Sequence, residues 1–107
     1  MKELTLKEIE IMSDMIEKFG EKQMIIAVEE LSELQKEICK KLRNPHSTSN
    51  EHILEEMADV YIMLTQITIF YQLKVDDIMK IMKEKLERTK RLYLNNSNNQ
   101  DKEQLKK

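Results

Sequence analysis

The fold class of this chain follows from residues 51–71, which read EHILEEMADVYIMLTQITIFY. Apolar residues recur there every three or four positions, the period of an α-helix, in a stripe of Ile53, Met57, Val60 or Tyr61, Leu64, Ile67 and Tyr71. The other sides carry Ile62, Met63, Ile69 and Phe70. A helix that is apolar nearly all round is buried all round, and a chain of 107 residues is too small to cover it alone. We therefore expect part of this helix to lie in a subunit interface.

Three other stretches show the same helical period, and they cover about 5–19, 21–43 and from Val75 or Asp76 to about 94. Gly20 ends the first stretch, and Asn44-Pro45 stops the second. The short connections between them favour antiparallel neighbours. The sequence therefore predicts an all-α protein, an antiparallel four-helix bundle.

The start of the helix at 51–71 is marked by polar residues. Thr48, followed three residues later by Glu51, has the form of a capping box, and Ser49 and Asn50 are equally good candidates for the cap. After Leu94 the chain turns to Asn, Ser and charged residues, which bury little apolar area. We expect one helical domain over residues 1–94 and a disordered polar tail over 95–107.

The composition supports the all-α class and limits the kinds of partner that we expect. The chain has one Gly and one Pro, too few for the many turns of a small β protein. A domain of this size often gains buried surface by self-association, so we expect a homo-oligomer, either a dimer or a tetramer. The net charge of −2 and the mixing of Lys with Glu argue against a general nucleic-acid binder.

No stretch approaches the roughly 20 apolar residues that span a bilayer, so no membrane partner is expected. Cys39 is the single cysteine and cannot form an internal disulfide. Residues 1–10 lack the apolar stretch of a signal peptide. These features predict a cytoplasmic protein.

Two pairs of carboxylates stand out from the other acidic residues. Glu30 and Glu33 are three residues apart in one predicted helix, and Glu56 and Asp59 are three apart in the next. Residues at this spacing share a helix face. If the two helices pack antiparallel, the four side chains converge.

A solvated acidic face is the alternative interpretation in a chain with 20 acidic residues. Ordinary surface helices place Lys or Arg four residues after Glu, whereas here Glu29 is followed by Glu33 and Glu55 by Asp59. Asp59 also lies on a helix that we expect to be enclosed, where an unpaired carboxylate is costly. A bound cation removes both conflicts, and a set of oxygen ligands without His or Cys suits Mg²⁺ or Mn²⁺.

The arrangement Glu29-Glu30-x-x-Glu33, then 22 residues, then Glu56-x-x-Asp59 resembles the motif of the MazG-like nucleotide pyrophosphohydrolases, an all-α superfamily. The resemblance covers roughly residues 5–93. It implies a four-helix MazG-like protomer that assembles with other copies. It also implies an enzyme that hydrolyses a (deoxy)nucleoside triphosphate to the monophosphate and pyrophosphate.

The same resemblance implies roles for individual residues. Mg²⁺, with Mn²⁺ as an alternative, is expected on Glu30, Glu33, Glu56 and Asp59. Glu29 matches the first Glu of the motif and is expected to be catalytic, either by metal contact or by positioning the attacking water.

Two basic residues of the last predicted helix are candidates for binding the substrate phosphates. Lys85 lies at the margin of its apolar stripe and Arg88 follows three residues later. The alternative is that both merely flank a surface helix. Some members specific for a deoxynucleotide carry an Asn and then a Lys-Tyr pair in this helix, and this chain has neither in the stretch 85–93.

Other functions remain open at this stage. One is a non-catalytic helical module that binds a nucleotide or a protein partner, and another is a pyrophosphohydrolase for a non-standard nucleotide. A di-iron carboxylate bundle is weaker, because such sites use Glu-x-x-His and no His stands three residues after any motif Glu.

Overall fold

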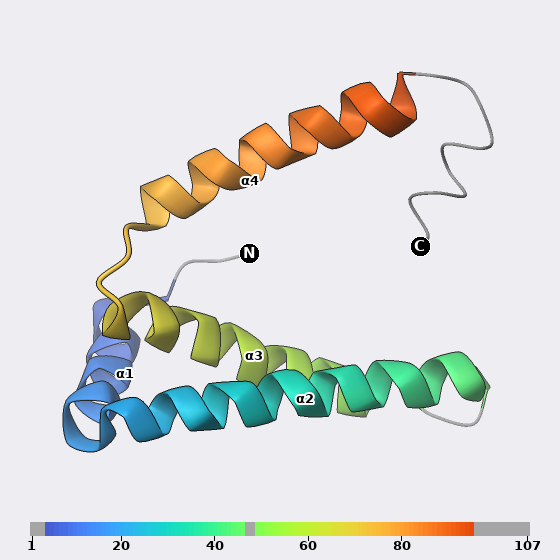
Figure 1. Ribbon diagram of the computed structural model, residues 1–107. Coiled ribbons are helices and arrows are strands. Elements are labelled where there is room, and N and C mark those ends of the chain that lie inside the picture. Colours follow the sequence, from blue (N-terminus) through green and yellow to red (C-terminus); the bar gives the residue numbers. More distant parts are fainter. Residues whose placement is uncertain (1–3, 47–48, 96–107) are drawn as a thin grey trace. The chain divides into compact units, whose positions relative to one another are not determined.

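The computed structural model describes residues 4–46 and 49–95, and throughout these ranges its regular structure is helical (Figure 1). Four α-helices, α1 (Leu6–Phe19), α2 (Glu21–Arg43), α3 (Glu51–Phe70) and α4 (Val75–Thr89), are followed by a short π-helix, η1 (Lys90–Leu94). No strand occurs in the described ranges, so the all-α class is confirmed. None of the helices described there is both long and apolar enough to cross a bilayer.

The chain forms two compact units, Met1–Gln72 and Leu73–Lys107, and each is treated by itself. The first unit contains α1, α2 and α3, and the second contains α4 and η1. The domain limits expected from the sequence, 1–94 and 95–107, stay a prediction. Apart from Asn95, the expected tail lies outside the described residues.

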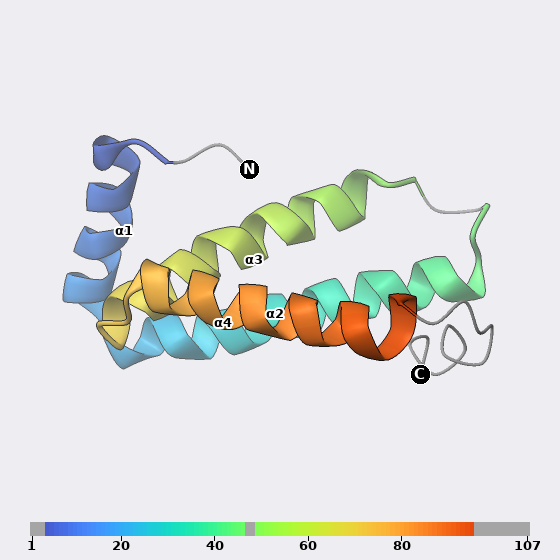
Figure 2. The same ribbon diagram turned by 90° about the horizontal axis from the view of Figure 1, so that it is seen from above.

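Helix α1 has a capping box at its N-terminus and a glycine at its C-terminus. The Thr5 hydroxyl accepts from the backbone N–H of Glu8 at 3.2 Å, and the Glu8 carboxylate accepts from the backbone N–H of Thr5 at 3.5 Å, a capping box. At the other end, Gly20 has a φ of 56°, a conformation that favours glycine. Gly20 alone separates α1 from α2, so the chain turns sharply there, and α1 crosses the other two helices instead of running alongside them (Figure 2).

Helices α2 and α3 form the antiparallel hairpin that the sequence predicted (Figure 2). Their inward faces, with one side chain from α1, make a small core. The buried residues of this core are Met12, Gln23, Ala27, Val60, Met63 and Gln66. The N-cap of α3 is Asn50, one of the expected candidates, and its side chain makes no capping hydrogen bond. The Ser49 hydroxyl accepts from the backbone N–H of Glu51 at 3.4 Å, and Thr48 lies outside the described residues.

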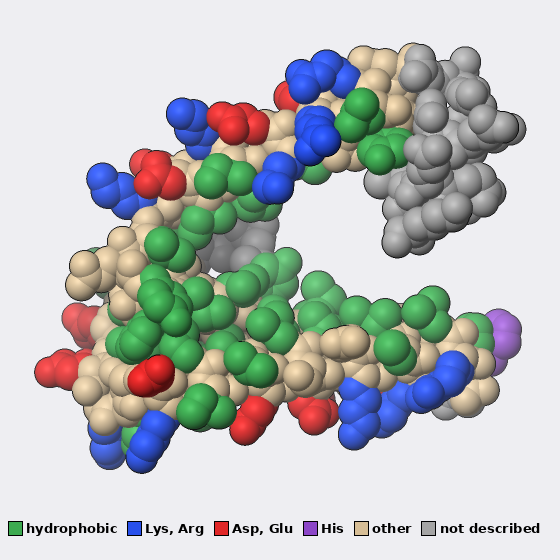
Figure 3. Space-filling model, viewed as in Figure 1, with side chains coloured by type: hydrophobic (Ala, Val, Ile, Leu, Met, Phe, Trp, Pro, Cys, Tyr) green, Lys and Arg blue, Asp and Glu red, His purple; other side chains and the backbone are tan. Residues whose placement is uncertain are grey.

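Within the first unit, the outward face of α3 is not covered by another helix. Apolar side chains that are between 41% and 70% exposed there are Leu54, Met57, Tyr61, Ile62 and Leu64. Figure 3 shows hydrophobic side chains gathered over the unit that contains α3. The side of α3 that faces α2 is therefore enclosed, while the expected subunit interface on the opposite side stays a prediction.

The second unit has no buried residue in α4. Its apolar face is between 36% and 65% exposed and consists of Val75, Ile78, Met79, Met82 and Leu86. The helix begins at Val75, one of the two starts expected from the sequence.

Candidate metal centre

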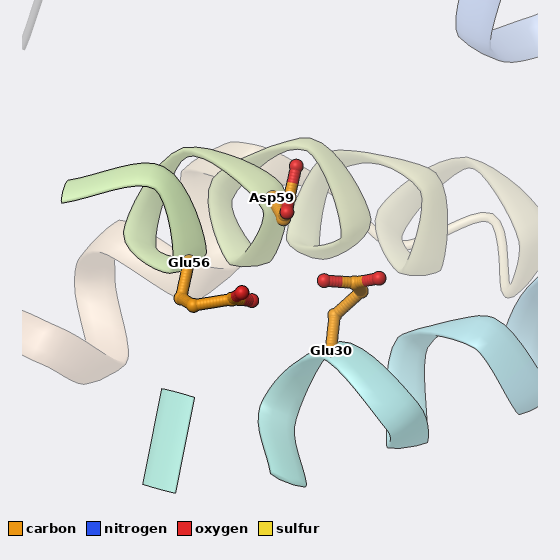
Figure 4. Close-up of side chains that lie close together, drawn as sticks. All are labelled: Glu30, Glu56 and Asp59. Atoms are coloured by element: carbon orange, nitrogen blue, oxygen red, sulfur yellow. The ribbon is translucent and has the colours of Figure 1, made fainter. Parts of the chain in front are cut away.

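Three carboxylates meet where α2 passes α3. Glu30 comes from α2, and Glu56 and Asp59 come from α3, one helical turn apart (Figure 4). Each offers one oxygen, and these three atoms all lie within 4.8 Å of one another. The antiparallel packing thus brings together three of the four ligands expected from the sequence.

Burial is shared unequally among the three side chains. Glu30 and Glu56 are half-buried, whereas Asp59 is exposed. The interpretation that Asp59 lies in enclosed surroundings is therefore wrong, because Asp59 stands at the solvent side of the α2–α3 contact. The cost of removing carboxylates from water falls on Glu30 and Glu56 instead.

One oxygen of the cluster lacks a partner. Glu56 Oε2 is buried and accepts no hydrogen bond from any described residue. Among the described residues, no Lys or Arg forms an ion pair with Glu30, Glu56 or Asp59. A buried acceptor without a donor costs roughly 1–3 kcal/mol, and more for a charged group. The described part of the chain thus supplies neither a positive charge nor a donor to Glu56 Oε2.

The pKa of Glu30 is raised above its ordinary value of 4.5. Loss of hydration is the main cause, followed by the negative charges of Asp59 and Glu56. When protonated, Glu30 can also donate a hydrogen bond to either neighbouring carboxylate, which favours its protonated form. Without a cation, Glu30 therefore holds its proton to higher pH than an isolated Glu.

These properties fit a hard divalent cation. Oxygen-only ligands suit Mg²⁺ and Mn²⁺. A cation between the three carboxylates would give Glu56 Oε2 a partner and would offset the repulsion that raises the pKa of Glu30. The residues present therefore fit the expected metal, and Glu30, Glu56 and Asp59 are the ones that would hold it.

The other two motif residues of α2 lie outside this cluster. Glu29 and Glu33 are exposed, and neither belongs to the group of oxygens within 4.8 Å. The expected roles of Glu33 as a ligand and Glu29 as a catalytic residue stay predictions.

The expected phosphate-binding residues lie together in the second unit. Lys85 and Arg88 line an open hollow of about 330 Å³ with Thr89, Leu92 and Tyr93. Two cations beside an aromatic ring are suited to phosphates and a flat base. The sequence offered Lys85 and Arg88 through their spacing. Tyr93 follows Thr89 by four residues and so falls on the same helix face, but the sequence offered no reason to choose it over the other aromatic residues as the partner of a base.

Comparison with known proteins adds no family to these observations. The chain matches no family model, no curated protein and no solved structure. The function has to be inferred from the residues of the site.

Proposed function

We propose that this chain is a cytoplasmic, Mg²⁺-dependent nucleotide pyrophosphohydrolase of the MazG-like type, which cleaves a (deoxy)nucleoside triphosphate to the monophosphate and pyrophosphate. The observation that carries the proposal is the convergence of Glu30, Glu56 and Asp59 from two helices. The buried, unpartnered Glu56 Oε2 adds weight, because a solvated acidic face leaves no such atom.

The chemistry of phosphoanhydride hydrolysis matches this arrangement. Negative charge must be neutralised and a water must be held in line with the bond that breaks. Mg²⁺, when bound, supplies charge neutralisation and polarises water. In this proposal Glu30, Glu56 and Asp59 hold the ion, Glu33 completes the set, and Glu29 contacts the metal or orients the water.

Lys85 and Arg88 are proposed to bind substrate phosphates. Both side chains are exposed, so they remain free to meet an anion from solvent. An Arg fork can contact two phosphate oxygens at once, and Lys adds a point charge.

A homo-oligomer belongs to the same proposal. Its support is the outward face of α3, where Leu54, Tyr61 and Ile62 help line an open apolar hollow of about 410 Å³. A second copy on this face would remove that surface from water. Tyr61→Lys is expected to lower the mass found by sedimentation, whereas Leu42→Lys, at an apolar position 75% exposed on α2, should leave it unchanged. A monomeric wild-type chain would contradict this part.

A non-catalytic nucleotide-binding module is the second candidate. One observation favours it, namely that Glu29, the expected catalytic residue, is exposed and outside the carboxylate cluster. Such a module would bind a metal-nucleotide complex without releasing pyrophosphate.

The deciding experiment is pyrophosphate release from the eight common ribo- and deoxynucleoside triphosphates, each with Mg²⁺ and with EDTA. Release that EDTA abolishes would establish the reaction and name the substrate. If the whole panel is silent, titration of the same nucleotides by calorimetry separates the binding module from an enzyme for a non-standard nucleotide.

A further inference from the structure

A second polar contact is buried in the α2–α3 interface. Gln23 on α2 is 3% exposed and Gln66 on α3 is 4% exposed. The side-chain amide of Gln23 donates through Nε2 to Oε1 of Gln66 at 2.7 Å. No other buried polar or charged residue occurs among the described positions.

This amide pair stands in a fixed relation to the carboxylates. Gln23 is seven residues before Glu30 on α2, and Gln66 is seven residues after Asp59 on α3. Seven residues correspond to two helical turns, about 10.5 Å along the axis. In an antiparallel pair, the alignment that places Gln23 against Gln66 therefore also places Glu30 against Asp59.

The layer between the two polar contacts does little to fix this alignment. It contains Ala27 and Met63, which are 2% and 5% exposed. Alanine offers a small, shallow contact and methionine adapts its shape to its surroundings. A slip of α2 along α3 by one turn, about 5.4 Å, would not be strongly opposed there.

The amide pair opposes the same slip directly. Shifting the helices by one turn separates Gln23 from Gln66 and leaves both amides buried without each other. Buried polar side chains of this kind are known to set the register of paired helices. The same slip would take Glu30 out of its place opposite Asp59, so the three carboxylates would no longer converge.

We propose that Gln23 and Gln66 are positioning residues, which hold α2 and α3 in the one register that keeps Glu30 against Glu56 and Asp59. The inference rests on the proposed function for the metal affinity of the cluster, but the register itself does not. The amides act through the carboxylates and touch neither metal nor substrate.

The paired variant Gln23→Met/Gln66→Met distinguishes a register-setting role of the two amides from a role in filling the core alone. When both partners of a buried hydrogen bond become apolar groups of similar shape, stability can be nearly unchanged. If the amides only fill the core, that variant should bind Mn²⁺ like the wild type. If they set the register, it should remain helical and lose at least tenfold in Mn²⁺ affinity.

The test measures Mn²⁺ binding to the full chain by calorimetry for the wild type, the paired variant and Gln35→Met. Gln35 is exposed on α2, so this control makes the same chemical change outside the core. Wild-type affinity in a folded paired variant would overturn the inference and leave the metal site standing. Absence of Mn²⁺ binding by the wild type would instead overturn the proposed function.

The register is also measured without metal. Spin labels at two exposed positions, Lys22 on α2 and His52 on α3, are introduced after Cys39→Ser, and their separation is recorded in wild-type and paired-variant backgrounds. We expect one narrow distance in the wild type and a broadened or shifted distribution in the paired variant. An unchanged narrow distance would refute the inference whether or not metal binds. If the paired variant fails to fold, Gln23→Asn, which shortens the amide arm and keeps its polarity, is put through both measurements and judged by the same outcomes.

Discussion

The interface between α2 and α3 contains two polar layers that differ in how they are satisfied. At Gln23 and Gln66 a neutral donor meets a neutral acceptor at 2.7 Å, and the contact is complete within the chain. Two turns away, Glu30 faces Glu56 and Asp59, and this layer holds three acceptors of like charge and a buried oxygen without a partner. The first layer is satisfied by its own hydrogen bond, whereas in the second the like charges raise the pKa of Glu30. The contrast separates a contact that is complete among the described residues from one to which our proposal assigns a metal ion.

The largest expected effect lies in the acidic layer. Glu30→Gln or Asp59→Asn should lower pyrophosphate release by at least 100-fold, because each removes a charged ligand while keeping the shape of the side chain. Helicity and oligomeric state should not change. Glu17→Gln, at an exposed position on α1, removes the same charge elsewhere and should retain full activity. Normal turnover by either site variant would exclude the cluster as the metal centre.

Metal binding should also raise the free energy of unfolding of the chain. Mn²⁺ or Mg²⁺ at about 100 times its dissociation constant would stabilise the folded chain by about 2.7 kcal/mol, because the cluster exists only when α2 and α3 are paired. Thermal unfolding with metal and with EDTA measures this. The increase in Tm should disappear in Glu56→Gln and persist in Glu17→Gln. An equal increase in all three proteins would show that the cations act elsewhere.

In the amide layer the single variants should cost more than the pair. Gln66→Met leaves the buried donor of Gln23 without its acceptor, which costs about 1–3 kcal/mol, whereas the paired Met variant should lie closer to the wild type. Urea unfolding of the wild type, both singles and the pair forms a double-mutant cycle. Additive losses would mean that the two amides do not act as a unit.

The smallest effect concerns pH. Because the pKa of Glu30 is raised in the folded chain, its favourable contribution to stability is complete below its unfolded pKa and is lost as pH rises through the folded value. In EDTA, Glu30→Gln should therefore gain stability over the wild type as pH is raised, by a few degrees in Tm at most. Melting curves of both proteins between acidic and neutral pH measure this. A difference in Tm between the two proteins that is the same at every pH would mean that the pKa of Glu30 is not raised in the folded chain.

Much of the fold could be predicted because the period of the apolar residues is local information. The limits of α2 follow from Gly20 before it and Asn44-Pro45 after it, and they agree with Glu21–Arg43. The crossing of α1 could not be predicted, because it depends on the backbone angles of one glycine and not on a pattern. The capping box at Thr5 and Glu8 has the Thr-x-x-Glu spacing of this motif, so the sequence contains the signal for it.

The site was predictable in part for the same reason. Spacing alone placed Glu56 beside Asp59, and antiparallel packing brought Glu30 to them. The exposure of Asp59 was not predictable, because an α3 that is apolar all round does not show which side faces α2. The buried contact between Gln23 and Gln66 could not be predicted, because the sequence does not show whether a glutamine is solvated or paired with another residue.

The single-residue joint at Gly20 has a consequence for how this chain tolerates insertion and deletion. Each residue added between α1 and α2 as a further helical residue turns one helix about 100° around its axis relative to the other. With no loop to absorb that rotation, one inserted residue would carry Met12, which is 5% exposed, from the core to the surface. Length at this joint is therefore as restricted as residue type, and an inserted residue should be tolerated less well here than in the longer connection between α2 and α3.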